Sequence, residues 1–569
     1  MRRGCPLLLP LASVGLLLLA LTADPPSAAR ALLPHADPVQ VDRVETGVGI
    51  LRALLLVDAV VLLLLTWMQR GVRHGLPGTK ATRPVEPVAW GGWAVTGLLS
   101  ATALVRLVGI GGDLWMDEVF TLVNYVQPGL GTVVGDFADD NQHVLYSLLA
   151  WASLQLFGET ATALRLPALA FGVASVWATL QLGRRALGVR EAWCAAALLA
   201  LSYHHVWFSQ NARGYTMLLF ATVLATDLYL RARDSGSVRI WVAYAITLSL
   251  GTWAHLTMVF VGAAHALITG ALYWRERGSG SRRLAPVWAL TLAGWVTAHL
   301  YAVTLPQMVA YFNQPGAGST TGGVAWSRPI WLVNETVRNL GVGLGLGWLG
   351  AGGAVAFGAY GLLRVWRRAP LLSVAMLLPS LLGGLTMLAL GRSLWPRFLF
   401  GAFGFCALIA ISGAVGLGDW LTRVRGWRRG WAVAPALLLV LVSAATVPRV
   451  YRYPKQDYTS ARDYVRGNLA PGDQVVALHM AGRVYNRYYA TEWDETSTLD
   501  ELTMRRAEKG RIWVLYTLPS YLAEARPELA AVLEAEFELM QVFPGTLGDG
   551  QIVVRRSRAP EAPRGASDR

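Results

Sequence analysis

The sequence has little charge and almost no cysteine for its length. Charged residues make up 15% of its 569 positions, well below the share in a soluble protein of this size. The three cysteines, Cys5, Cys194 and Cys406, all lie in or beside apolar segments. Because none lies in the polar C-terminal region, that region has neither a disulfide framework nor a zinc knuckle.

The formal net charge of +14 would suit a nucleic-acid-binding protein, but the distribution of the charge excludes one. From Arg449 to Arg569, 17 basic and 17 acidic residues cancel. The whole excess therefore lies in the apolar part of the chain, mostly in the connections between apolar runs. This pattern indicates a membrane topology and predicts no nucleic-acid partner.

Long apolar runs are abundant. Hydrophobic residues make up 54% of the chain, tryptophan occurs 23 times, and the mean hydropathy is +0.41. Runs of about 18–23 residues are long enough to cross the ~30 Å of hydrocarbon in a bilayer. We therefore expect an all-α polytopic membrane bundle of about 13 spans, the first of which could instead be a signal peptide. The expected spans lie near residues 6–21, 48–67, 88–110, 163–182, 191–208, 214–231, 238–256, 257–275, 285–305, 345–366, 371–390, 395–416 and 431–447.

Basic residues give the bundle an orientation. The connections assigned to the cytoplasm hold 23 Lys and Arg, whereas the outer connections before the C-terminal region hold eight. We therefore expect a multi-pass protein of the cell membrane whose loop at 111–161 is extracytoplasmic. That loop has seven acidic residues and no Lys or Arg. Its apolar stretch at 141–157 is interpreted as an amphipathic helix on the outer surface.

The chain divides into four parts. Residues 1–87 form two extra N-terminal spans, and residues 88–447 form the main membrane domain. Residues 448–556 are predicted to be a small extracytoplasmic α/β domain, with strands near 474–478, 511–516 and 551–555 and helices near 460–468 and 519–537. The tail at 557–569, rich in Pro, Ala and Arg, is predicted to be disordered.

The outer loop begins with three acids close to a span end, Asp113, Asp117 and Glu118. Carboxylates at the mouth of a membrane helix are costly unless something uses them. One of them could act as a general base that removes a proton from an attacking hydroxyl. The alternative is that they are solvated acids that cap the following helix.

A second polar group contains Asp140, His143 and Tyr146 at the start of the surface helix. These side chains could form a rim that binds donor or acceptor hydroxyls. Asp140 could instead cap the helix and His143 could be an ordinary interfacial residue. The carboxylates and the histidine could also bind a divalent metal ion, although no spacing in this group is specific for one.

A third group lies in a short outer turn that contains Gln210, Arg213 and Tyr215. An arginine at the outer face runs against the positive-inside trend, which suggests an anionic partner such as a phosphate. That phosphate could belong to an ordinary lipid headgroup or to a lipid-linked donor. His255 and Arg397 are also expected at the outer face, where each alone could be structural.

These groups, in this order, resemble motifs of the GT-C superfamily of membrane glycosyltransferases. The likeness is to the branch that contains protein O-mannosyltransferases and the lipid A aminoarabinose transferase, glycosyltransferase family 39-like enzymes, and it covers about residues 88–450. Two positions depart from the pattern, because Val144 replaces a proline pair and Phe398 replaces a tyrosine. The matching motifs are Asp117-Glu118, His143-Val144-Leu145-Tyr146, Phe157-Gly158, Arg165-Leu166-Pro167, Gly183-Arg184-Arg185, Ser209 to Tyr215, and Arg397-Phe398.

The resemblance implies transfer of one sugar, with inversion, from a polyprenyl-phosphate donor to a hydroxyl of a glycan, lipid or protein acceptor, without a cofactor or a catalytic metal ion. Asp117 would be the base, Glu118 the second carboxylate, and Arg213 the cation that binds the leaving phosphate. The other candidates for substrate binding are Asp113, Asp140, His143, Tyr146, Gln210, Tyr215, His255 and Arg397. A transporter or flippase of lipid-linked sugars would share the spans, but it would normally show internal repeats and polar residues at mid-membrane depth. A non-catalytic scaffold would leave the acidic loop unexplained.

Overall fold

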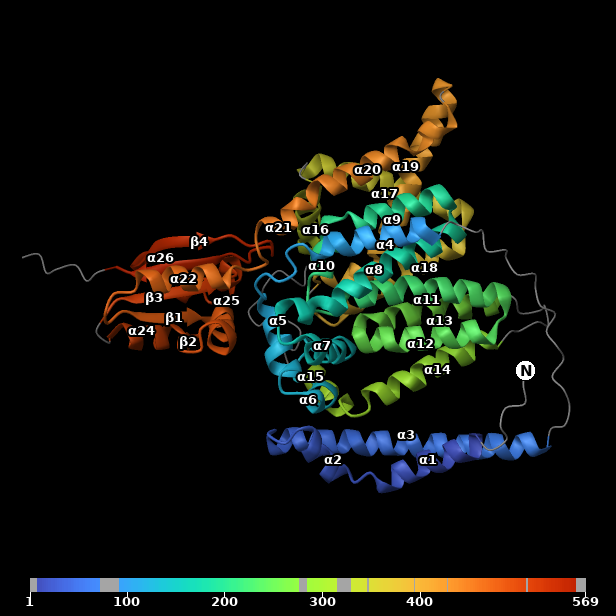
Figure 1. Ribbon diagram of the computed structural model, residues 1–569, viewed down its shortest axis with the longest axis horizontal. Coiled ribbons are helices and arrows are strands. Elements are labelled where there is room, and N and C mark those ends of the chain that lie inside the picture. The colour runs from blue at the N-terminus through green and yellow to red at the C-terminus, as the bar shows by residue number, and fades with distance from the viewer. Residues whose placement is uncertain are drawn as a thin grey trace, which may run out of the picture.

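The computed structural model describes residues 8–71, 92–275, 284–314, 329–344, 347–392, 394–426, 428–507 and 510–558. Its first part is a helical hairpin in which α1 (Leu8–Thr22) packs against the long helix α3 (Pro38–Gly71), with the short α2 (Pro25–Leu32) between them. Figure 1 shows this hairpin, in dark blue, along one side of the bundle.

The main membrane domain is a bundle of apolar helices that run side by side across Figure 1. Helical segments coincide with all thirteen expected spans in the described part of the chain, although the span at 191–208 is divided between two helices. The helices after α3 are α4 (Gly92–Leu107), α8 (Ala161–Ala186), α9 (Val189–Ala200), α10 (Tyr203–Ser209), α11 (Tyr215–Ser235), α12 (Val238–Ala254), α13 (Val259–Arg275), α14 (Ala285–Tyr301), α15 (Leu305–Asn313), α16 (Pro329–Leu344), α17 (Gly347–Arg368), α18 (Pro370–Ala389), α19 (Phe403–Arg425) and α20 (Ala434–Thr446).

Six helical segments of the described chain are long and apolar enough to cross a membrane, or up to eight if each of two bent pairs is one span. This finding confirms a mostly helical, polytopic membrane protein, while the number thirteen remains a prediction. The buried faces of α8, α11 and α19 are rich in Ala, Gly, Ser and Thr, whose small side chains allow membrane helices to approach closely.

The expected outer loop contains four short helical elements, α5 (Met116–Phe120), the π-helix η1 (Thr121–Val126), α6 (Leu130–Gly135) and α7 (Val144–Phe157). Figure 1 shows α7 nearly end-on, whereas α11, α12 and α14 run across the view. One face of α7 packs on α8 through Tyr146 and Ala150, and at its C-terminal end Leu156 is 75% exposed. Helix α7 therefore lies across the direction of the neighbouring bundle helices, while its place on the outer membrane surface remains a prediction.

The C-terminal region is a five-stranded sheet covered by helices, in the strand order β2-β1-β3-β5-β4. Strands β1, β2 and β3 are parallel, and β5 is antiparallel to both β3 and β4. The sequence predicted β1, β3 and β5 but not β2 and β4, and the single helix expected at 519–537 is broken at Pro527. The elements are β1 (Gln474–Leu478), β2 (Asp494–Thr496), β3 (Ile512–Thr517), β4 (Phe537–Phe543), β5 (Ile552–Ser557), α22 (Tyr458–Asn468), α23 (His479–Val484), α24 (Leu499–Ala507), α25 (Pro519–Ala525) and α26 (Pro527–Glu536).

Direct hydrogen bonds join this domain to the loop that carries the paired acids. Asp113 accepts from the backbone N–H and the hydroxyl of Thr459, both at 2.8 Å. The backbone N–H of Met116 donates to Gln456 Oε1 at 3.0 Å. The short helix α21 (Pro448–Arg452) connects α20 to the domain. The C-terminal domain therefore holds the start of the outer loop in place.

Candidate active site

Glu118 is enclosed by donors from three other segments of the chain. Its side chain is fully buried, and its two oxygens accept from Arg165 Nε at 2.8 Å and Arg165 Nη2 at 2.5 Å. The backbone N–H of Ala212 adds a third bond at 2.6 Å. Lys455 Nζ lies 3.9 Å from the same carboxylate and donates to the carbonyl of Gln210.

Arg165 also ties the loop to the bundle. Its guanidinium donates to the carbonyls of Ile110, Gly112 and Asp113 at 2.7–2.8 Å. Every bond of this arginine is therefore made to the segment that precedes or contains the acidic pair. A planar guanidinium can bind a carboxylate bidentately and still donate to several carbonyls, which makes it suited to this framework role.

The ionisation of this buried group follows from its neighbours. Burial alone would raise the pKa of Glu118, but the charges of Arg165 and Lys455 outweigh it, so its pKa lies below the usual value. Burial lowers the pKa of Lys455 to about 7, although the charge of Glu118 opposes the shift. The cluster thus holds one anion between two basic groups, of which Lys455 titrates near neutrality.

Asp117, the neighbour of Glu118, has a different environment. Its side chain is 7% exposed, and Arg397 Nη1 lies 3.2 Å from Oδ2. Within the described parts of the chain, Arg397 is its one ion-pair partner. Asp117 is therefore the less enclosed of the two acids.

Arg213 lies nearby, 3% exposed, on the turn before α11. Its Nη1 donates to the backbone carbonyl of Asn141 at 2.7 Å and to the side-chain oxygen of the same residue. The Nε atoms of Arg213 and Arg397 are both buried and have no hydrogen-bond partner among the described residues. Buried donors normally have partners, so these two unused guanidinium donors suggest an anionic ligand.

Aromatic and imidazole rings fill the space between the two arginines. The rings of His143 and His255 lie 4.7 Å apart, and the ring of Tyr215 lies 5.6 Å from the first and 5.1 Å from the second. Nδ1 of His143 donates to the carbonyl of Ala254 at 2.9 Å. Burial and the charge of Arg213 lower the pKa of His143, so its ring is neutral at pH 7.

The structure brings together six of the predicted site residues and places the others in supporting contacts. Those brought together are Asp117, His143, Arg213, Tyr215, His255 and Arg397. Among the others, Tyr146 is buried and its hydroxyl donates to the carbonyl of Leu164 at 2.6 Å. The amide of Gln210 donates to the carbonyls of Arg106 and Val108. Asp140 is at the rim, where it accepts from Tyr311 at 3.0 Å.

Two contributors escaped the sequence reasoning. Asn141 binds Arg213 and was not among the predicted site residues. Lys455 comes from the connection to the C-terminal domain, far from the acidic loop in sequence. Its Nζ also lies 5.2 Å from the ring centre of Trp207. No local motif marks either residue, because each depends on a contact between distant segments.

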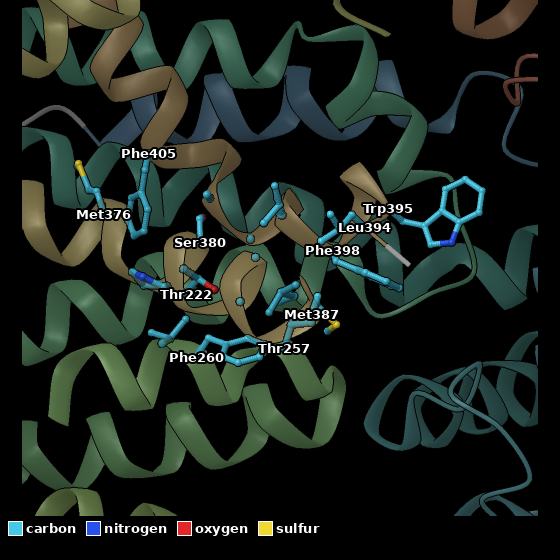
Figure 2. Close-up of a pocket in the computed structure, with 18 residues that line it drawn as sticks. Thr222, Thr257, Phe260, Met376, Ser380, Met387, Leu394, Trp395, Phe398 and Phe405 are labelled. Carbon is cyan, nitrogen blue, oxygen red and sulfur yellow. The ribbon is translucent and has the colours of Figure 1, made fainter. Parts of the chain in front are cut away.

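An apolar pocket opens beside this group, as Figure 2 shows. Trp395 and Phe398 lie toward one end, and Phe405 and Met376 lie toward the other. The guanidinium of Arg397 lies 4.9 Å from the ring centre of Trp395, so that end borders the Asp117–Arg397 pair. The lining residues come from α11, the 3₁₀ turn η2 (Leu256–Met258), α13, α18, the 3₁₀ helix η4 (Pro396–Ala402) and α19.

The described features define a polytopic membrane protein with a carboxylate and two arginines at one end of a helical bundle. Residues 142–309 match the family model described as dolichyl-phosphate-mannose-protein mannosyltransferase. This match confirms the resemblance to GT-C glycosyltransferases that the motifs indicated, and the matched segment contains His143, Arg213 and His255. No curated protein matches the chain significantly in sequence.

Several solved structures are similar in fold. ArnT from Cupriavidus metallidurans in the apo state has 12% identity and a TM-score of 0.47, covering 82% of this chain and 98% of its own. Archaeal oligosaccharyltransferase AglB from Archaeoglobus fulgidus, in complex with an inhibitory peptide and a dolichol-phosphate, has 13% identity and a TM-score of 0.45, covering 82% and 76%. Arabinosyltransferase EmbB from Mycobacterium smegmatis has 14% identity and a TM-score of 0.41, covering 71% and 45%.

Proposed function

We propose that this protein is a membrane glycosyltransferase that transfers a sugar from a polyprenyl phosphate to an acceptor hydroxyl. The observations that carry the proposal are the ion pair between Asp117 and Arg397 and the two buried Nε atoms, of Arg213 and Arg397, that have no hydrogen-bond partner among the described residues. This arrangement supplies a base and an anion site side by side. The match of residues 142–309 to a family named for a polyprenyl-phosphate sugar donor supports the same reaction.

In the proposed mechanism the donor phosphate binds between Arg213 and Arg397. The hydroxyl oxygen of the acceptor attacks the anomeric carbon while Asp117 accepts the proton of that hydroxyl. The bond between the anomeric carbon and the phosphate oxygen breaks. The departing polyprenyl phosphate gains negative charge, which the two guanidinium groups stabilise. Because phosphate is a good leaving group, the reaction needs no strong general acid. Attack opposite the leaving group inverts the anomeric centre.

The ion pair between Asp117 and Arg397 gives a physical reason for the donor to bind before the acceptor. In the free protein Arg397 is held by the carboxylate at 3.2 Å. A bound phosphate competes for the same guanidinium, so Asp117 loses part of its stabilising partner and becomes a stronger base. The donor would thereby prepare the base for the acceptor.

The apolar pocket of Figure 2 is suited to the first part of the polyprenyl chain. Its walls are mainly Leu, Met and Phe side chains and glycine backbone, and its Trp395 end lies against Arg397. A lipid phosphate at the arginines would extend its isoprenoid tail along these walls, where burial of apolar surface stabilises it by about 25 cal/mol per Å².

We further propose that this site and the C-terminal domain face the outside. The distribution of basic residues supports this orientation. Single cysteines at Ser497 in the C-terminal domain and at Ser235 at the other end of α11, in a background without native cysteines, test it. A membrane-impermeant maleimide should label intact cells at position 497 and not at position 235. The opposite labelling would contradict the orientation.

The function itself is tested by incubating the purified protein with a panel of polyprenyl-phosphate sugars. We expect at least one donor to be consumed, by transfer or by slow hydrolysis, with release of polyprenyl phosphate. Movement of an intact lipid-linked sugar across vesicles without its consumption would instead favour a flippase. The Asp117→Asn variant is the matched control, because it should bind donor without consuming it.

A further inference from the structure

The C-terminal domain has a recognisable ligand-binding topology at one edge of its sheet. The chain leaves β1 to form β2 on one side, then crosses to form β3 on the other side of β1. The carboxyl ends of β1 and β3 are therefore a point where the strand order reverses. In open α/β sheets, ligands bind outside the carboxyl ends of the strands at such a point.

The backbone at this edge is unusual. In the described chain, three residues other than glycine have a positive φ: His479 at 49°, Leu518 at 54° and Asp549 at 59°. His479 directly follows β1, and Leu518 directly follows β3. Asp549 accepts from the backbone N–H of Ser520 at 2.9 Å, so it belongs to the same edge. Left-handed backbone at non-glycine residues costs free energy and tends to occur at functional positions.

Two arginines and two rings lie at this edge, beside the acids Asp549 and Glu495. The rings of His479 and Tyr521 lie 5.7 Å apart. Arg483 lies four residues after His479 on α23, and Arg526 directly follows α25, which carries Tyr521. Burial and the charges of both arginines lower the pKa of His479, in keeping with one cluster of four groups. Arg483 also pairs with Glu495 at 3.6 Å. Two arginines beside aromatic rings suit a saccharide with an acidic group, because rings stack on sugars and guanidinium binds oxyanions.

This edge lies next to the helix that carries Asp117. Helix α23, which begins at His479, packs against α5. Gln456 links the two regions, since it accepts from the N–H of Met116 and donates to Thr517, the last residue of β3, at 2.8 Å. In Figure 1, α25 lies on the side of the C-terminal domain that faces the membrane helices.

From these features we propose that the His479–Tyr521 edge binds an acidic group, phosphate or carboxylate, on the acceptor saccharide. The proposal rests on the glycosyltransferase function proposed above and specifies its acceptor. The acidic group would lie at Arg483 and Arg526, while a hydroxyl of the same saccharide extends toward Asp117. The outer domain would thus select acceptors by their charge.

Ligand-observed saturation-transfer NMR on the full-length protein in nanodiscs tests the proposal. The probes are mannose 6-phosphate, glucuronate and, as the neutral control, mannose. We expect at least one acidic sugar to bind more tightly than mannose. The double variant Arg483→Gln/Arg526→Gln should weaken that binding about tenfold to hundredfold, as for loss of charge-assisted hydrogen bonds. Which acidic sugar responds distinguishes a phosphate from a carboxylate.

Two further variants separate this edge from other sites. Arg556→Gln changes an arginine opposite Trp513, at the other end of β3, and should leave binding unchanged. Arg213→Ala should also leave it unchanged, because Arg213 belongs to the donor site. Equal binding by wild type and the double variant, or loss of binding in Arg213→Ala instead, would overturn the proposal. A wild type that consumes no donor would refute the proposed function, whereas this binding result would stand independently.

Discussion

Two charge clusters lie side by side at the mouth of the bundle, and they are built in opposite ways. Around Glu118, Arg165, Ala212 and Lys455 satisfy a fully buried carboxylate. Around Asp117, one ion pair leaves two buried guanidinium Nε atoms without partners. Adjacent residues of the same chemical type are therefore separated into a closed cluster and an open cluster.

The difference separates the contribution of each carboxylate to the fold from its contribution to the reaction. In the closed cluster the donors around Glu118 bind protein atoms, so these bonds stabilise the positions of the outer loop, α8 and the turn before α11. The open cluster keeps donors unused in the folded state, which costs stability unless a ligand uses them. We infer that Glu118 supports the fold and that Asp117 supports the reaction.

The largest expected effect comes from Asp117→Asn. The change keeps the shape of the side chain and removes the group that accepts the proton, so turnover at saturating donor should fall about 10²–10⁴-fold. The thermal midpoint should stay near that of wild type. Asp113→Asn is the matched control, since Asp113 binds Thr459 of the C-terminal domain and should affect stability more than turnover. Normal turnover in Asp117→Asn would remove this residue from the mechanism.

Glu118→Gln should have the opposite profile. Loss of the charge leaves Arg165 and Lys455 without their shared anion, and breaking a buried ion pair typically destabilises a protein by about 3–5 kcal/mol. The purified variant should melt at a clearly lower temperature in detergent or nanodiscs. A stable Glu118→Gln protein that has lost turnover would show that both carboxylates take part in the chemistry, and the comparison would fail.

Arg213→Ala tests the open cluster from its other side. A charge-assisted hydrogen bond to phosphate contributes about 1.5–3 kcal/mol, so the donor titration should weaken by about one to two decades. Arg213→Lys should recover part of this loss, because a lysine lacks the planar fork but keeps the charge. Because the alanine variant also loses the bonds from Nη1 to Asn141, its thermal midpoint should fall as well, and the donor titration is made on protein shown to be folded. An unchanged donor titration in Arg213→Ala would assign the residue to lipid headgroups instead.

Sequence reasoning identified candidate residues for this site but could not tell which of them face a ligand and which support the fold. Long apolar runs located the helices, and the motif resemblance selected Asp117, Arg213 and Arg397 as site residues, of which Asp117 and Arg397 form an ion pair. It could not tell that Tyr146 and Gln210 donate to backbone carbonyls, because that depends on where distant chain segments lie. The closed cluster was invisible for the same reason, since Lys455 lies more than 300 residues beyond Glu118.

Lys455 gives the smallest and most selective test, because it is the group of the closed cluster that titrates near neutral pH. Burial holds its folded pKa at about 7, below the ordinary 10.5, so between these values the unfolded chain binds the proton more strongly than the folded chain. Stability should therefore rise with pH in this window, by at most about 1.4 kcal/mol per pH unit. Thermal midpoints of wild type and Lys455→Met at pH 6.5, 7.5 and 8.5 give this contribution by difference, which cancels titrations common to both proteins. We expect the thermal midpoint of the wild type to rise relative to that of the variant as pH rises. Donor binding at Arg213 should have the same pH dependence in both proteins. Parallel curves would mean that Lys455 keeps its proton through this range and that the cluster stabilises its charged form.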